Sequence, residues 1–140
     1  MPNPNDGVIE VTSRYPVAET IDQLEERVRA RGLMVFARID FGGDAARAGL
    51  TLRPMESLLF GNPRAGTPVL AANPRAGLDL PLRALAWEAG DGVVRVSYNS
   101  PEWVAARHGI PEAVAKNLEA IHSLISEATG APGEGAPAIH

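Results

Sequence analysis

The stretch RPMESLLFGNPRAGTPVLAANPRAGLDLPLR, residues 53–83, decides how this chain folds. It reads as a buried strand, a turn rich in Pro and Gly, a short helix and a second turn that leads into another strand. The pentapeptide Asn-Pro-Arg-Ala-Gly occurs twice, at 62–66 and 73–77. Pro holds φ near one value and Gly also allows positive φ, so these residues determine the course of the backbone. We therefore expect this segment to bring polar side chains together at one end of a sheet.

Within the stretch, residues 56–60 form an apolar strand that ends at Gly61. Thr67 before Pro68 predicts a helix N-cap with Pro at the first helical position, and Pro74 ends that helix after residue 72. We also expect Gly61 and Gly66 to supply unusual backbone angles in the turn.

Before this stretch, residues 8–15 alternate in polarity, as a half-buried strand does. Residues 18–31 predict a helix with an apolar stripe, and Gly32 stands where a left-handed C-cap is expected. Residues 33–41 predict a second, strongly apolar strand. Asp44 can cap a short helix that Gly49 ends.

After the stretch, residues 82–88 and 93–99 flank Ala-Gly-Asp-Gly and predict a β-hairpin. Ser100 begins a helix that ends at Gly109. Pro111 opens the last helix, for which we expect one long element. Its apolar stripe consists of Val114, Leu118, Ile121 and Ile125.

These elements predict an α+β fold, a two-layer sandwich in which one mostly antiparallel sheet of about five strands is covered by helices. The order lacks the steady strand–helix alternation of a doubly wound fold. We expect a single domain over 8–129, a flexible lead-in at 1–7 and a mobile tail at 130–140.

Composition excludes several kinds of function. The net charge is −4 and the 13 basic residues are scattered, whereas a nucleic-acid surface needs them clustered. There are no cysteines, which excludes thiol nucleophiles, disulfides and thiolate metal sites. No apolar run has the ~20 residues of a membrane helix, and the start lacks the pattern of a signal peptide. We expect a cytoplasmic protein that binds neither nucleic acid nor membrane.

Residues 61–67, GNPRAGT, superficially match a phosphate-binding loop. The match fails because no Lys follows Gly66 and because Pro63 and Pro68 remove backbone N–H donors that such a loop uses. A smaller expectation remains, that Arg64 and the amides near Thr67 hold a small anion at a helix start. A purely structural turn is the more common use of such a cap.

The histidines at 108, 122 and 140 have no spacing that predicts a metal site, and we expect neither metal nor cofactor. His108 precedes a Gly at a helix end, where it serves either as a cap or as a functional group. Asp79 stands between two leucines. A carboxylate there either caps backbone amides or has a perturbed pKa suited to catalysis.

Polar groups that flank strand ends or helix starts around the central stretch define a candidate pocket for a small polar ligand. Its members are Arg53, Asn62, Arg64, Thr67, Asp79 and His108. We predict a ligand-binding or sensing domain without catalysis. The alternative is a small enzyme with Asp79 or Glu56 as base and His108 as acid. No Gly-x-Ser-x-Gly elbow is present, and the sequence leaves open whether the protein is an enzyme.

Five segments carry a resemblance to a known family: RGLMVFARIDF, AARAGLTLRP, LLFGNPRAGTPVL, LDLPLRALAWE and VSYNSPEWVAARHGI. In these, the chain resembles the domain-of-unknown-function 302 family of small bacterial and archaeal proteins, over residues 8–128. The resemblance implies a compact two-layer domain that is often a homodimer, and it implies no catalytic residues. From the sequence we also expect a homodimer, because the helix containing Trp103 and the last helix carry more apolar surface than one sheet covers.

Overall fold

The computed structural model describes residues 6–130, so most of the predicted lead-in and tail, and His140, lie outside the described residues. The chain forms one sheet of five strands in the order β1-β5-β4-β3-β2, with antiparallel neighbours throughout. This arrangement confirms the predicted α+β fold. The strands are β1 Val8–Ser13, β2 Met34–Asp40, β3 Met55–Gly61, β4 Leu82–Glu88 and β5 Val94–Asn99. The helices are α1 Val17–Ala30, α2 Phe41–Arg47, α3 Pro63–Ala72, α4 Pro101–His108, α5 Glu112–Ala115 and α6 Ala120–Thr129, with 3₁₀ turns η1 Pro74–Leu78 and η2 Lys116–Leu118.

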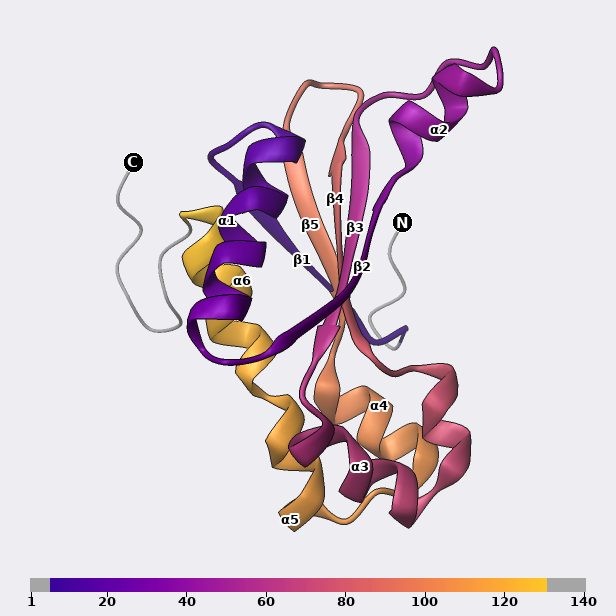
Figure 1. The fold of residues 1–140 in the computed structure, drawn as a ribbon, viewed down its shortest axis with the longest axis vertical. Coiled ribbons are helices and arrows are strands. Elements are labelled where there is room, and N and C mark those ends of the chain that lie inside the picture. Colours follow the sequence, from indigo (N-terminus) through magenta and orange to yellow (C-terminus); the bar gives the residue numbers. More distant parts are fainter. Residues whose placement is uncertain (1–5, 131–140) are drawn as a thin grey trace.

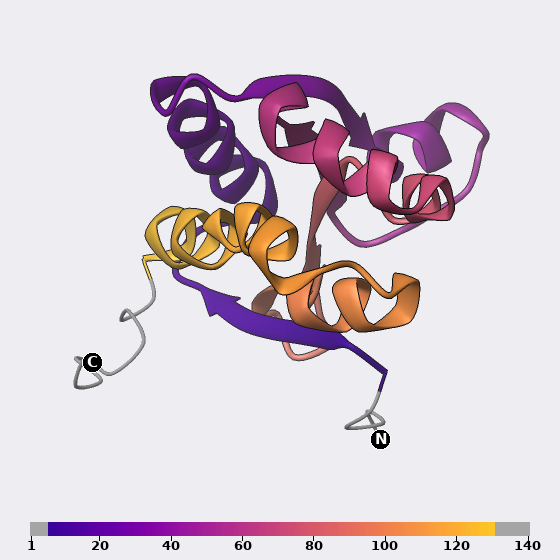
Figure 2. The same cartoon turned by 90° about the horizontal axis from the view of Figure 1, so that it is seen from below.

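Helices α1 and α6 cover one face of the sheet (Figures 1 and 2). The predicted α1 stripe is buried, with Ile21 and Val28 at 0% exposure. From α6, Ile121 and Ile125 are each 1% exposed. We expected a homodimer from the apolar stripes of α6 and of the helix that contains Trp103, and the chain itself covers both. The stripe of α6 packs on the sheet, and Val104 and Ala105 of α4 are also buried. Large exposed apolar side chains lie both on the edge strands, as Phe36 at 50% exposure does, and outside the sheet, as Leu50 and Leu78 do at 68%.

The main core lies between this helix pair and the sheet. It is built from the strand residues that point toward α1 and α6, among them Leu58 and Phe60, both 0% exposed. Alternate strand residues point to the opposite face because side chains on a strand alternate. Among residues 6–130, no helix lies across the middle of that opposite face (Figure 1).

A second, smaller core lies beyond the end of the sheet, where α3, η1, α4, α5 and η2 gather (Figure 1). Its buried members are Val69, Ala76, Ala105, Ile110 and Leu118. Leu82, the first residue of β4, packs against both cores and so joins them.

Helix α3 differs from the prediction. It begins at Pro63 and includes Pro68, so the predicted N-cap at Thr67 is wrong. The Asn62 side chain caps it by accepting a hydrogen bond of 3.0 Å from the Arg64 amide. Asn62-Pro63 and Thr67-Pro68 both encode a cap followed by Pro at the first helical position, and the earlier of these two pairs begins the helix.

The repeated pentapeptide is explained by the same cap. The Asn73 side chain accepts a hydrogen bond of 3.1 Å from the Arg75 amide at the start of η1. Each copy of Asn-Pro-Arg-Ala-Gly therefore begins a helical segment in the same way.

Two other boundaries differ. Helix α2 begins at Phe41, capped by Asp40 rather than Asp44, through a 2.8 Å bond from the Gly43 amide. The single long helix expected after Pro111 is divided into α5, η2 and α6.

The expectation of unusual angles at Gly61 and Gly66 is wrong. Neither has a positive φ, whereas Gly109, the C-cap of α4, has φ +62°. Gly66 lies inside α3, and a Cβ there would have no neighbouring atom within 4 Å.

We predict that Gly66→Ala stabilises the fold by about 0.5–1 kcal/mol, because Ala restricts the unfolded chain and favours a helix interior. Gly109→Ala serves as the control and should destabilise by about 1 kcal/mol, because its left-handed φ strains an L-residue. Urea denaturation of both variants measures the two changes. A loss of stability in Gly66→Ala contradicts the helical assignment.

Candidate functional site

Two of the predicted site residues meet at the end of the sheet. Asp79 lies between η1 and β4, and His108 is the last residue of α4. The Asp79 Oδ2 atom lies 2.6 Å from His108 Nε2 and 2.8 Å from Arg107 Nη1. One carboxylate therefore holds two consecutive side chains of α4.

This cluster is mostly buried. The His108 side chain is 3% exposed and that of Asp79 is 12% exposed. Burial by itself raises the pKa of Asp79, but hydrogen bonds from His108 and Arg107 outweigh it and hold the pKa below its usual value. The Asn73 side chain also donates to the His108 carbonyl at 2.9 Å. The cluster thus joins η1, α4 and the start of β4.

Of the other predicted site residues, Asn62 lies at the same end of the sheet as Asp79, and Arg53 lies at the opposite end. Arg53 precedes β3 and lies 3.4 Å from Glu88 Oε2, whereas Asn62 follows β3 at its opposite end. Seven strand residues separate these ends by about 23 Å. Arg64 and Thr67 are exposed on α3. The structure brings Asp79 and His108 together and does not place Arg53 with them.

The space beside Asp79 is small. A void of about 10 Å³ borders this carboxylate, which is room for about one water molecule and not for a metabolite. Its lining consists of Asp79, Leu80, Leu82, Arg83, Asn99, Pro101, Val104, Leu118 and Ile121. The Asp79–His108 pair therefore links η1, α4 and the start of β4, and the void beside it is too small for a metabolite.

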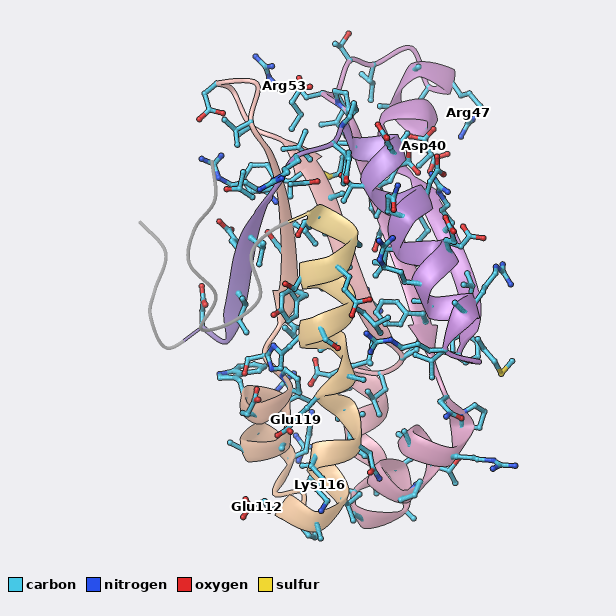
Figure 3. All side chains as sticks on the ribbon, turned by 90° about the vertical axis from the view of Figure 1, so that its left-hand side faces the viewer. Asp40, Arg47, Arg53, Glu112, Lys116 and Glu119 are labelled. Carbon is cyan, nitrogen blue, oxygen red and sulfur yellow. The ribbon has the colours of Figure 1, made fainter. Side chains whose placement is uncertain are left out.

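A larger hollow lies on the other side of α4. A groove of about 360 Å³ runs between α4 and the α5–η2 segment. Its apolar floor includes Ala105 and Ile110, and its charged rim consists of Glu102, Glu112, Lys116 and Glu119. The last three lie close together at the lower end of the molecule (Figure 3). This groove was not predicted from the sequence, although the spacing of residues 112, 116 and 119 places them on one side of a helical segment.

A chain of hydrogen bonds leads from the core to this groove. The Tyr98 hydroxyl lies 2.8 Å from His122 Nδ1, and His122 Nε2 lies 3.1 Å from Glu102 Oε1. Ser100 donates to the other Glu102 oxygen at 2.9 Å. Partial burial raises the pKa of Glu102, but its own backbone amide, His122 and Ser100 together hold the pKa below its usual value. With Glu102 ionised, His122 donates from Nε2 and its ring is oriented toward Tyr98.

Glu56, the alternative base, lies on β3 with its carboxylate 2.8 Å from the Arg38 guanidinium. Arg38 also reaches Asp22 at 2.7 Å, so this cluster joins α1 to the sheet. Within residues 6–130, no group of three or more His, Asp or Glu side chains is arranged to hold a metal ion.

The fold and these sites together define a two-layer α+β domain with an antiparallel sheet, a helical end and a surface groove. Residues 9–128 match the family described as "Domain of unknown function DUF302". The chain belongs to this family. A crystal structure of an uncharacterised conserved DUF302 protein from Bacillus stearothermophilus shares the fold, with a TM-score of 0.72 over 89% of this chain and 97% of that one, at 21% identity.

Longer relatives contain a similar segment. The chain is 46% identical over 104 residues to "Fluoride-specific ion channel FluC 1" of Brucella suis biovar 1, covering 74% of this chain and 41% of that protein. "Fluoride-specific ion channel FluC 2" of Brucella melitensis biotype 1 is also 46% identical over 104 residues, which is 38% of its length. The chain thus spans about two fifths of the curated relatives that it matches. In residues 6–130, no helix combines the length and apolar character needed to cross a membrane.

We predict that Asp79→Asn lowers the free energy of unfolding at pH 7 by about 1–3 kcal/mol, because it removes a charged partner from buried donors. The folded-state pKa of Asp79 is depressed, so this contribution is fully present above the unfolded pKa of about 3.9 and is lost as the pH falls through the folded value.

Urea denaturation at pH 7 and at pH 3 should therefore show a gap between wild type and Asp79→Asn that narrows at low pH. Asp44→Asn is the control, since the Asp44–Arg47 pair is exposed and should contribute little. An equal gap at both pH values would show that the Asp79 charge does not hold α4.

Proposed function

We propose that this domain binds a small organic ligand in the groove between α4 and the α5–η2 segment, and that it does not catalyse a reaction on it. The groove itself carries this proposal. Its volume of about 360 Å³ suits a small metabolite, and an apolar floor with a few charged groups at the rim is typical of ligand sites.

The rim charges favour a cationic or zwitterionic ligand. Three carboxylates, those of Glu102, Glu112 and Glu119, surround the groove together with the single ammonium of Lys116. An amine is attracted to the carboxylates, and a carboxylate on the same ligand can reach Lys116. A small polar ligand was also predicted from the sequence, but at a different place in the fold.

A small acid–base enzyme is the second candidate, and the Tyr98–His122–Glu102 chain favours it. Glu102 lines the groove and can accept a proton from a bound molecule, while His122 behind it orients the carboxylate. In such an enzyme Glu102 is the base, whereas Asp79, Glu56 and His108 stabilise the fold through their hydrogen bonds and ion pairs. Loss of turnover with retained binding in His122→Gln would distinguish an enzyme from a binding domain.

The context of the Brucella relatives supports a sensing role. Their names describe fluoride-specific ion channels, and the segment similar to this chain forms about two fifths of each protein. We propose that the domain reports the presence of a ligand to a protein partner, in the cytoplasm, and that it acts as a homodimer.

We predict that small amines and amino acids raise the melting temperature of the wild-type chain, whereas simple carboxylates do not. A ligand that binds only the folded state at 100 times its Kd stabilises by about 2.7 kcal/mol. The double variant Glu112→Gln/Glu119→Gln should lose most of this shift.

Glu19 is exposed on α1 and does not line the groove, so Glu19→Gln is the matched control and should keep the ligand-induced rise in melting temperature. Differential scanning fluorimetry over a panel of amines, amino acids and carboxylates provides the test. If no compound of the panel stabilises the wild type, or if the Glu112/Glu119 double variant responds as the wild type does, the groove is not the site.

A further inference from the structure

Glu102 stands out on the rim of the groove because both of its carboxylate oxygens are hydrogen-bonded. His122 Nε2 lies 3.1 Å from Oε1, and the Ser100 hydroxyl donates to Oε2 at 2.9 Å. Ser100 is itself fixed as the N-cap of α4, where it accepts a 3.2 Å hydrogen bond from the Trp103 amide. The Glu102 side chain is nevertheless 56% exposed and lines the groove. It is therefore a positioned carboxylate that a ligand can reach.

The His122 ring is held from its other side by Tyr98. The Tyr98 hydroxyl lies 2.8 Å from Nδ1, and the two rings meet edge-on, with their centroids 5.7 Å apart and their planes at 68°. Tyr98 lies on β5, is 6% exposed and belongs to the main core. Because the core fixes Tyr98, the position of the imidazole follows from the fold. The His122 side chain is still 35% exposed, so solvent can exchange protons with it.

Both charge states of His122 fit this geometry. In the neutral ring, Nε2–H donates to ionised Glu102 and Nδ1 accepts from the Tyr98 hydroxyl. In the cation both ring nitrogens donate, and the Tyr98 hydroxyl can rotate to accept from Nδ1. Protonation therefore adds a positive charge beside Glu102 without moving either neighbour.

We propose that Glu102 is the group of the groove that binds the ammonium of a ligand, and that a proton on His122 opposes this binding. The inference rests on the proposed function and adds to it a dependence on pH. Neutral His122 leaves the charge of Glu102 to the ligand, whereas the imidazolium forms an ion pair with Glu102 and repels a second cation beside it. His122 is thus a positioning residue, and the affinity for amines should fall as the pH falls.

The groups around His122 support this assignment. It faces Tyr98 from β5 and Glu102 from α4, and among residues 6–130 no other carboxylate lies within 4.0 Å of its ring nitrogens. On its own segment, its backbone amide donates to the Glu119 carbonyl at 3.1 Å. The other charged residues that line the groove are Glu112, Lys116 and Glu119.

The relevant pH range follows from these groups. Histidine is the side chain whose charge ordinarily changes between pH 5 and 8. Partial burial raises the pKa of Glu102, but its own backbone amide, His122 and Ser100 hold the pKa below its usual value, so Glu102 stays ionised over this range. The charge beside the ligand then changes at His122 and not at Glu102.

NMR titration of the full chain with n-butylamine at pH 5.5, 6.5 and 8.0 tests the proposal. The reporters are the methyl signals of three residues that line the groove, Ala105, Ala106 and Ala115. The ammonium of n-butylamine, like that of a lysine side chain, stays charged over this range. We expect the wild-type Kd to rise at least about fivefold between pH 8.0 and 5.5, which is the lower end of the usual coupling between two sites.

Two histidine variants separate the role of His122 from a general effect of pH. His122→Gln keeps a donor for Glu102 without a group that titrates, so its Kd should change less than about twofold over the same range. His108→Gln is the matched control, because His108 bonds to Asp79 and does not line the groove. It keeps a donor for Asp79 and should show the wild-type pH dependence.

Four outcomes would overturn the proposal. A wild-type Kd that stays constant or falls toward pH 5.5 shows that proton and ligand do not oppose each other, and leaves the groove as a site. Wild-type pH dependence in His122→Gln shows that another group titrates, and its loss in His108→Gln as well shows a general effect on the fold. If n-butylamine shifts none of the three methyl signals at any pH, Glu102 is not an ammonium site. The melting-temperature panel then reports separately on whether the groove binds another ligand.

Discussion

Burial of a single face of the sheet by α1 and α6 is the constraint on which this fold depends. The five strands present apolar residues to that helix pair, and the core closes between them with Leu58, Phe60 and Ile21 fully buried. Among residues 6–130, the remaining helices lie at the ends of the sheet, so none covers the middle of the opposite face (Figure 1). The packing that produces the core therefore leaves this second face without a helical layer.

The helical end of the molecule is organised by a different interaction. Asp79 holds Arg107 and His108, so the end of α4 is tied to the start of β4, and Leu82 connects the small core there to the main one. With α4 fixed, the α5–η2 segment lies beside it and leaves the groove between them. His122 and Tyr98 attach Glu102 on that groove to α6 and β5. The groove is thus built on elements whose positions are set by buried contacts, as a binding site requires.

Much of this fold follows from sequence patterns, and the failures have local causes. The α1 stripe, the β4–β5 hairpin and the antiparallel sheet were predictable because periodicity and turn residues act over short distances. The start of α3 was not, since Asn62-Pro63 and Thr67-Pro68 are equivalent signals and only the tertiary contacts of α3 select one. Asp79 and His108 were predicted to share a site and do meet, but around a void for about one water. Glu112, Lys116 and Glu119 look like a solvated helix surface until α4 lies opposite them.

Hydroxyl-radical footprinting of the wild-type chain in dilute solution tests most directly that α1 and α6 cover only one face of the sheet. We expect rapid oxidation of Met34 and Phe36, which lie on β2 at the edge of the face opposite α1 and α6, and protection of Phe60, which packs under these helices. Protection of Met34 and Phe36 to the same extent as Phe60 would show that the opposite face is also covered, and would contradict a sheet buried on one face.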